Sequence, residues 1–373
     1  VGGAMMITSS LSLLNTMFRG KDRAIAFAIW GAMVGTVAAL GPLLGGFLTS
    51  SYSWRWAFLI NVPIAIISIT GALLLAPESK DTVSKPGLDL PGVLLSAFGL
   101  GALIFGLIEG QNYGWWAPRG ANIAIGPFEW PIDAISPVPI AFALSFLALF
   151  LFIRVESSRA AEDQVITLDL SLFKIRSFAW GNIIGLCIMF GEFGMILTLP
   201  IYLQNGLGYT ALKAGATTAF IMLGALIAAP ASGKFTQARG PLAVVRTGLI
   251  LEVIAMIGVG ATYSATATQW QFVPWLLLFG AGVGLGTAQL VNVILRDVPV
   301  NKSGQASGTQ STSRQVGTAL GVAVLGAVLW TSLGTNLTAA LQKPEIGFSE
   351  QQASGVSDAV VQSSGVIINA NPE

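Results

Sequence analysis

Long apolar stretches separated by short polar connections run through the whole chain of 373 residues. A helix of about 20 apolar residues crosses the hydrocarbon core of a bilayer, so each stretch predicts one membrane-spanning helix. Ten such helices are predicted, at 1–18, 24–49, 57–76, 91–109, 138–154, 178–203, 211–232, 242–262, 272–295 and 305–331. The pattern therefore predicts an all-α, polytopic membrane helix bundle.

The basic residues between these stretches predict the orientation of the chain. Alternate connections carry 15 of the 19 Lys and Arg residues, and only Arg55, Arg119, Lys213 and Lys343 fall on the other side. Connections rich in Lys and Arg face the cytoplasm. The alternation also supports the number of helices, because one missed helix would exchange the two sides.

Composition excludes several classes of protein. Hydrophobic residues make up 53% of the chain and charged residues 10%, whereas a soluble domain carries about 25% charge. A net charge of +1 disfavours a nucleic-acid partner. The chain has no His and a single Cys, Cys187, so it lacks the commonest general base and the commonest metal ligands. We expect no metal or cofactor and no enzymatic activity, and a scaffold is equally disfavoured. No phosphate-binding G-x-x-x-x-G-K-[ST] loop for ATP is present.

The longest connections differ in character. Residues 110–137 are predicted to be external and 155–177 to form a charged cytoplasmic linker, while 332–373 read as an external polar tail. Tryptophans gather at predicted external boundaries, which is typical of an interfacial aromatic belt rather than of substrate stacking. They are Trp54, Trp56, Trp115, Trp116, Trp270 and Trp275.

Small residues form one face of the second predicted helix. They are Gly31, Gly35, Ala38, Ala39, Pro42, Gly45 and Gly46, the last three within the run GPLLGG that begins at Gly41. Such a face lets another helix approach closely, and packing alone would explain it. Its neighbours distinguish it, because FRGKDRA precedes the helix and WRWAFLINVP follows it.

This ordered set resembles the 14-helix drug:proton antiporter branch of the major facilitator superfamily. In that family a helix with the glycine-proline "antiporter" motif precedes an outer W-R-W-x-F-x-x-N-x-P stretch, matched here by Trp54, Arg55, Trp56, Phe58, Asn61 and Pro63. Further matches are LDLPG at 88–92, LIEGQNYGW at 107–115, LPIYLQNGLGYTALKAG at 199–215 and SGTQSTSRQVGTALGVAVLG at 307–326. The resemblance therefore covers essentially the whole chain.

The resemblance implies a major facilitator fold, with two pseudo-symmetric helical halves and an inserted helix pair, truncated at both ends. The ten helices would be family helices four to thirteen. The implied parts are 1–79, the end of the N-terminal half; 80–177, the inserted pair with its linker; 178–331, the C-terminal half; and 332–373, the tail. Two departures stand out: Val37 replaces a usual glycine, and Gln237 and Ala238 replace the Asp-Arg pair of a cytoplasmic loop motif.

Two carboxyl groups, those of Glu192 and Glu252, fall well inside predicted helices. A charged group there costs on the order of 2.5–3.5 kcal/mol on insertion scales, so its presence requires a functional or a structural reason. Either could exchange a proton for a cationic substrate, or could anchor a neighbouring helix. Glu109 matches a family boundary residue and is expected to be structural. Arg314 could reach the cytoplasmic surface or pair with an acidic residue, in a gating or a positioning role.

Polar and glycine residues inside the helices complete the candidate set. Cavity-lining groups or interhelical hydrogen bonds are expected at Asn182, Gln204, Gln289 and Asn292. In FGAGVGLG, Gly280, Gly282, Gly284 and Gly286 alternate along one helix, which predicts contacts on two faces or local flexibility for a gate; packing is favoured.

The resemblance implies a secondary exporter that moves drugs or other amphipathic small molecules by alternating access, driven by inward proton flow. The alternative is a dedicated metabolite, antibiotic or lipid exporter of the same superfamily. The expected partners are a small-molecule substrate, protons and the lipid bilayer, with no nucleic acid. A monomeric, multi-pass protein of the bacterial inner membrane is expected.

Overall fold

The computed structural model describes most of the chain beyond residue 50. The described ranges are 51–75, 87, 89–118, 123–125, 128–131, 135–344 and 346–362, with residues 6, 9, 10, 13, 14, 17, 18, 22, 25–27, 29, 30, 33, 41 and 44–49. Much of the first two predicted helices therefore lies outside the described residues, and so do Gly31, Gly35 and Pro42.

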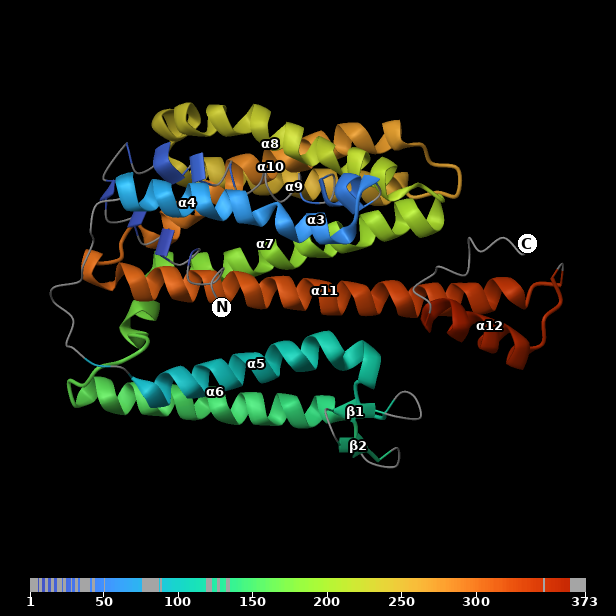
Figure 1. Cartoon of the computed structure of the whole chain (residues 1–373), viewed down its shortest axis with the longest axis horizontal. Helices are drawn as coiled ribbons and strands as arrows, with labels where there is room; N and C mark the ends of the chain where they lie inside the picture. The colour runs from blue at the N-terminus through green and yellow to red at the C-terminus, as the bar shows by residue number, and fades with distance from the viewer. Residues whose placement is uncertain are drawn as a thin grey trace. The chain divides into compact units, whose positions relative to one another are not determined.

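Eight helices in the described part of the chain are long and apolar enough to cross a membrane. They match the last eight helices predicted from the sequence, and the polytopic helical class is thereby confirmed. Figure 1 shows these helices. Their bounds are α4 (Asn61–Leu75), extended at its start by α3 (Trp54–Leu59), then α5 (Leu90–Tyr113), α6 (Pro137–Ala161), α7 (Arg176–Ile201), α8 (Ala211–Arg239), α9 (Pro241–Thr262), α10 (Gln269–Leu295) and α11 (Ser303–Leu341).

Short elements fill the connections. They are the antiparallel pair β1 (Ile123–Ile125) and β2 (Phe128–Trp130), the 3₁₀ turns η1 (Leu170–Lys174) and η3 (Val300–Lys302), the π-helical turn η2 (Tyr202–Gly206) and the helix α12 (Glu350–Gln362). The predicted tail is therefore partly helical: α11 continues past residue 331, and α12 follows it. Hydropathy falls at residue 332, but the Ala and Leu residues that follow are good helix formers.

The helices belong to two compact units. One comprises the described parts of 1–82 and 199–300, and the other those of 83–198 and 301–362. The four parts implied by the family resemblance are a different division of the chain, and they stay a prediction.

In the first unit, α10 lies between α8 and α9 (Figure 1). Successive residues of a helix point about 100° apart, so glycines two positions apart face opposite sides. A Cβ atom on Gly284 would come within 2.8 Å of the Ala225 carbonyl oxygen on α8, whereas one on Gly282 would come within 2.7 Å of the Gly248 carbonyl oxygen on α9. The predicted two-sided packing of the glycine run is confirmed.

The neighbouring helices contribute glycines of their own. A Cβ atom on Gly224 of α8 would overlap the Leu277 carbonyl oxygen, and one on Gly248 of α9 would lie 2.7 Å from the Gly282 carbonyl oxygen. Farther along, the Trp275 ring covers Gly258. In this unit, helices therefore meet backbone to backbone, which membrane helices use because lipid gives them little hydrophobic drive to associate.

The predicted tryptophan belt divides into two groups. Four rings are exposed, as expected for rings that face lipid headgroups: Trp54, Trp56, Trp116 and Trp270 are 59%, 51%, 80% and 67% exposed. Trp275 packs on α9 instead, and Trp115 lies against Gly110 and stacks on Phe142. The latter two rings fill space left by glycines.

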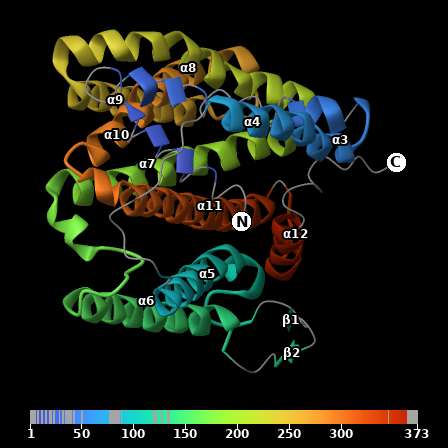
Figure 2. The ribbon, with the colours of Figure 1, turned by 60° about the vertical axis from the view of Figure 1, so that its left-hand side comes forward.

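In the second unit, α5 and α6 form a hairpin (Figure 2). The Ser145 hydroxyl donates to the Gly99 carbonyl oxygen at 2.7 Å across this hairpin. Leu107 of α5 packs against Ala319 and Ala323 of α11. On another side of α11, Gly317 and Gly321 lie against the backbone of α7, so close that a Cβ at either would overlap a carbonyl oxygen.

An ion pair fixes the linker that follows α6. Asp169 pairs with Lys302 at the start of α11, and its backbone amide donates to the Gln305 side-chain oxygen at 3.1 Å. Burial alone would raise the pKa of Asp169, but the Lys302 ammonium and hydrogen bonds from Ser171 outweigh it, so the pKa lies below its usual value. The linker is therefore attached to α11 by charge as well as by hydrogen bonds.

We expect Gly280→Ala to destabilise the protein by about 1–3 kcal/mol, because the added methyl group overlaps the Ile221 carbonyl oxygen and α8 has to move. Gly260→Ala on α9 is the matched control, since no described atom lies within 4 Å of its Cβ position, and alanine should be neutral or stabilising there. Thermal unfolding of the purified protein in detergent measures both, and equal stability of the two variants would contradict the backbone contact.

The Asp169–Lys302 pair should make stability depend on pH. A lowered pKa in the folded state means that the pair stabilises the fold above the unfolded pKa of Asp169, and that this contribution disappears as pH falls through the folded pKa. Asp169→Asn should therefore cost about 1 kcal/mol near neutral pH, and progressively less as the pH falls through the lowered pKa of Asp169 in the folded state. Denaturant unfolding at several pH values tests this, with Asp163→Asn, an exposed carboxylate of the same linker, as control. A cost that persists unchanged in acid would contradict it.

Candidate functional site

Glu192 and Arg314 lie on the two helices that glycines bring together in the second unit. Glu192 on α7 is 6% exposed, and Arg314 on α11 is partly buried. The Glu192 carboxylate acts electrostatically on the Arg314 guanidinium. A Cβ atom on Gly194 would overlap Leu325 of α11, so the helices are in contact beside this pair. Of the roles considered for Arg314, the geometry favours an interaction with an acidic residue.

Glu252 lies in the first unit, on the side of α9 that faces α10. Its side chain is 4% exposed. A Cβ atom on Gly282 would come within 2.6 Å of the Glu252 Cγ atom, and one on Gly286 would lie 3.6 Å from its Oε1 atom. The Glu252 side chain therefore occupies space that exists because α10 has no side chains at these two positions.

A cavity of about 240 Å³ is lined on one side by the end of the glycine-proline run and on another by the first turns of α8. Gly45, Gly46 and Gln204 line it, so three residues singled out in the sequence come together here. The other lining residues are Thr49, Pro200, Ala211, Ala214, Gly215 and Thr218. A Cβ atom on Gly46 would be 3.6 Å from the Ala211 carbonyl oxygen, whereas no described atom lies within 4 Å of one on Gly41 or Gly45.

The π-helical turn η2 shapes the wall of this cavity. It begins two residues after Pro200, which has no amide hydrogen to donate, and it carries Gln204. The Gln204 amide donates to the Pro200 carbonyl oxygen at 3.4 Å. Turns of this kind often occur inside helices at functional sites.

The remaining polar candidates lie in helix contacts. The Gln289 amide of α10 donates to the Ser232 hydroxyl of α8 at 3.3 Å, and Asn292 donates to the Gln289 oxygen at 3.4 Å. Asn182 donates to the Phe178 carbonyl oxygen of its own helix at 2.8 Å. This geometry favours hydrogen bonding in the helix bundle over a cavity lining for these three residues.

The candidate residues near the predicted external surface lie at or near the ends of helices. The Asn61 amide donates to the Phe58 carbonyl oxygen at 3.2 Å and so closes α3, while Pro63 lies in the first turn of α4. The Arg55 guanidinium lies 5.0 Å from the centre of the Trp54 ring. Glu109 is partly exposed in the last turns of α5. These positions favour structural roles.

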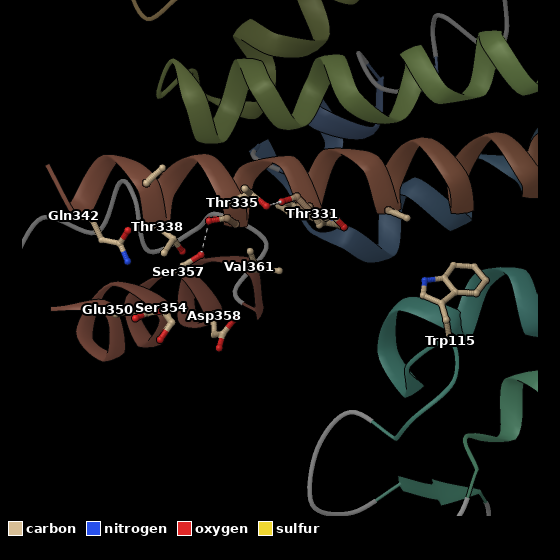
Figure 3. Close-up of a pocket in the computed structure, with 14 residues that line it drawn as sticks. Trp115, Thr331, Thr335, Thr338, Gln342, Glu350, Ser354, Ser357, Asp358 and Val361 are labelled. Atoms are coloured by element: carbon tan, nitrogen blue, oxygen red, sulfur yellow. Dashed lines mark hydrogen bonds between the residues drawn. The ribbon is translucent and has the colours of Figure 1, made fainter. Parts of the chain in front are cut away.

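A polar groove of about 590 Å³ lies between the end of α11, α12 and Trp115. Figure 3 shows Ser357 of α12 pointing toward α11, where Thr335 and Thr338 lie. The Ser357 hydroxyl donates to the Gly334 carbonyl oxygen at 2.9 Å and holds the two helices together. Sequence reasoning missed this groove because residues 332–373 were predicted only as an external polar tail, with no helix pair within it.

Sequence reasoning also missed two buried carboxyl groups, those of Asp89 and Glu156, which are 3% and 1% exposed. The one sequence feature that could have indicated this pair is the run LDLPG, which contains Asp89. Among the described residues, no group of three or more His, Cys, Asp or Glu side chains could hold a metal ion.

Comparison with known proteins agrees with this architecture. The family model described as Major Facilitator Superfamily matches residues 1–322. The chain is 32% identical over 356 residues to the "Probable actinorhodin transporter" of Streptomyces coelicolor, covering 91% of this chain and 56% of that protein. It is 25% identical to the "Tetracenomycin C resistance and export protein" of Streptomyces glaucescens, covering 96% and 62%. It is 28% identical to the "Multidrug resistance protein Stp" of Mycobacterium tuberculosis, covering 92% and 59%.

The chain thus spans less than two thirds of the length of these relatives. The family match, in contrast, covers most of this chain and includes seven of the eight membrane-length helices in full. The chain is a multi-pass, non-enzymatic membrane protein and belongs to the Major Facilitator Superfamily.

Proposed function

We propose that this chain belongs to a proton-coupled antiporter of the 14-helix branch, which exports drugs or other amphipathic small molecules by alternating access. The protein would work as a monomer in the bacterial inner membrane, with its substrate, protons and lipid as its only partners. The observation that carries this proposal is the buried Glu192 carboxyl group on α7, whose charge acts on the Arg314 guanidinium of α11 where glycines bring these two helices together.

A carboxyl group beside a guanidinium has two states that differ by one proton. When Glu192 is ionised, Arg314 balances its charge; when Glu192 takes up a proton, Arg314 is left with an uncompensated charge. Buried ions without a partner are costly, so protonation should favour a rearrangement that gives Arg314 water or another anion. Such coupling between a proton and a helix contact is what proton-driven alternating access requires.

Two further features support a transport role. Glu252 is a second buried carboxyl group, placed against the glycine face of α10, and it is a second candidate for proton coupling. The cavity beside Gly45, Gly46 and Gln204 offers space next to the glycine-proline run. We infer that this cavity belongs to the path of the substrate.

A dedicated exporter of one metabolite, antibiotic or lipid is the second candidate function. Two of the relatives carry names that refer to single compounds, actinorhodin and tetracenomycin C, which favours this reading. The name of a third refers to multidrug resistance. A substrate panel that includes lipophilic cations and aromatic natural products would separate a broad exporter from a dedicated one.

We expect Glu192→Gln, in the full-length protein in inverted membrane vesicles, to abolish substrate-dependent proton release, because glutamine cannot exchange a proton. The same substitution leaves Arg314 without its charge partner and should destabilise the protein by about 3–5 kcal/mol. Fluorescence of a pH-sensitive dye measures proton release, and thermal unfolding measures stability.

The double variant Glu192→Gln/Arg314→Gln separates coupling from structure. It should recover most of the stability and none of the proton release. Recovery of both would reduce Glu192 to a structural anchor, and full proton release in Glu192→Gln alone would rule out coupling at this residue. Glu109→Gln, at the predicted outer end of α5, is the matched control and should behave as wild type.

We expect Gly45→Leu to reduce transport without destabilising the fold. No described atom lies within 4 Å of the Gly45 Cβ position, so a leucine side chain would extend into the 240 Å³ cavity. Stability should stay within about 0.5 kcal/mol of wild type, while the apparent affinity for substrate falls. Unchanged transport kinetics with an inserted, stable protein would place the substrate path elsewhere.

A further inference from the structure

Asp89 and Glu156 form a buried pair of carboxyl groups that has no part in the transport proposal. Asp89 precedes the first turn of α5, and Glu156 lies near the end of α6, two residues after Arg154, which marks the predicted cytoplasmic boundary. The Thr167 amide donates to oxygens of both side chains, Asp89 Oδ2 at 3.0 Å and Glu156 Oε1 at 3.4 Å, so the two carboxyl groups lie next to each other. Two adjacent buried carboxylates repel each other, which favours one proton on the pair.

Gly92 makes the meeting of the two side chains possible. A Cβ atom at residue 92 would overlap carboxyl oxygens of both Asp89 and Glu156. The Gly92 amide donates to Asp89 at 3.0 Å, at the start of α5. The pair therefore depends on the glycine at position 92 and forms where the end of α6 meets the beginning of α5.

The neighbouring groups decide which residue holds the proton. Burial raises the pKa of Asp89, but hydrogen bonds from Glu156, from the Gly92 amide and from the hydroxyl and amide groups of Thr167 outweigh it and leave the pKa below its usual value. Arg159 on α6 also faces the pair, with its Nε atom 3.4 Å from Asp89 Oδ1. We therefore assign the negative charge to Asp89 and the proton to Glu156.

With one proton, the site is electrically neutral, because the Asp89 carboxylate balances the Arg159 guanidinium. Without the proton, two adjacent buried carboxylates share one cation. Two adjacent carboxyl groups do not both ionise readily. Whether the pair carries its proton therefore decides whether the charges of Asp89, Glu156 and Arg159 cancel.

The same carboxyl groups hold the linker that follows α6. The Thr167 amide and hydroxyl donate to Asp89 Oδ2 at 3.0 and 2.9 Å, and the Leu168 amide donates to Glu156 Oε2 at 3.1 Å. Arg159 adds a bond from its Nε atom to the Val165 carbonyl oxygen at 3.2 Å. Residues 165–168 are therefore fastened to the hairpin through the pair and its counter-ion.

We propose that Asp89 and Glu156 form a proton-binding site on the predicted cytoplasmic face, and that the bound proton fastens residues 165–168 to the α5–α6 hairpin. When the proton leaves Glu156 for cytoplasmic water, the carboxylates repel each other and release the Thr167 and Leu168 amides. The linker between α6 and α7 is thereby held at low pH and released at high pH. This inference does not depend on the proposed antiport.

Amide hydrogen exchange of the full chain in detergent micelles tests whether the bound proton holds residues 165–168 on the α5–α6 hairpin. The protection factor of the Thr167 and Leu168 amides should fall about tenfold per pH unit between the pKa of the carboxyl group in the opened state and the higher pKa of the closed pair, because opening releases one proton in that range, and it should level off at higher pH. In Glu156→Gln, whose amide can still donate to Asp89, protection should persist at high pH. Glu162→Gln, an exposed carboxyl group at the end of the same helix, is the matched control and should follow wild type. A pH-dependent loss of protection that is the same in Glu156→Gln would overturn the proposal.

Infrared spectroscopy of the same samples in an ester-free detergent provides a second readout that does not depend on the linker. The difference spectrum of wild type minus Glu156→Gln should show the carbonyl band of one protonated carboxyl group, which shifts slowly on exchange into D₂O and disappears as pH rises. The spectrum of wild type minus Glu162→Gln should show no such pH-dependent band. Absence of the band from the Glu156→Gln difference spectrum would refute the site.

Discussion

Close approach between helix backbones is the constraint on which this structure depends. Lipid chains are as apolar as leucine, so helices in a bilayer associate through packing and polar contacts rather than through exclusion from water. Here glycines provide that packing in both compact units, between α8, α9 and α10 in one and between α7 and α11 in the other. Glycines also leave room for buried carboxyl groups: Gly282 and Gly286 lie beside Glu252, and Gly92 lies beside Asp89 and Glu156.

Buried acidic groups are accommodated in three physically different ways. Glu252 lies against glycine backbone, Glu192 acts electrostatically on the Arg314 guanidinium, and Asp89 and Glu156 adjoin each other beside Arg159. The second and third arrangements contain an opposite charge. Each arrangement lowers the cost of placing a carboxyl group out of water, and each responds differently to the loss or gain of one proton.

The sequence predicted those features that depend on local pattern. Eight of the ten predicted helices lie in the described residues and are confirmed, and the two-sided contacts of Gly280 to Gly286 follow from helix geometry alone. Contacts between distant segments left no local signal. Asp89 and Thr167 are 78 residues apart, and the cavity joins Gly46 to Gln204 and Thr218. Trp275 had the composition of a membrane-interface residue, yet the space over Gly258 determined its position. The remaining site residues stay predictions, because polar groups inside a bundle serve packing and transport with the same chemistry.

The glycine run of α10 has a consequence for motion. Because Gly280 and Gly284 meet the backbone of α8 while Gly282 and Gly286 meet α9, α10 cannot slide or turn against one neighbour without colliding with the other. A side-chain interface can repack by changing rotamers, but a backbone interface has no rotamers to change. We therefore expect α8, α9 and α10 to move as one rigid body during a conformational change, with the hinges outside these three helices.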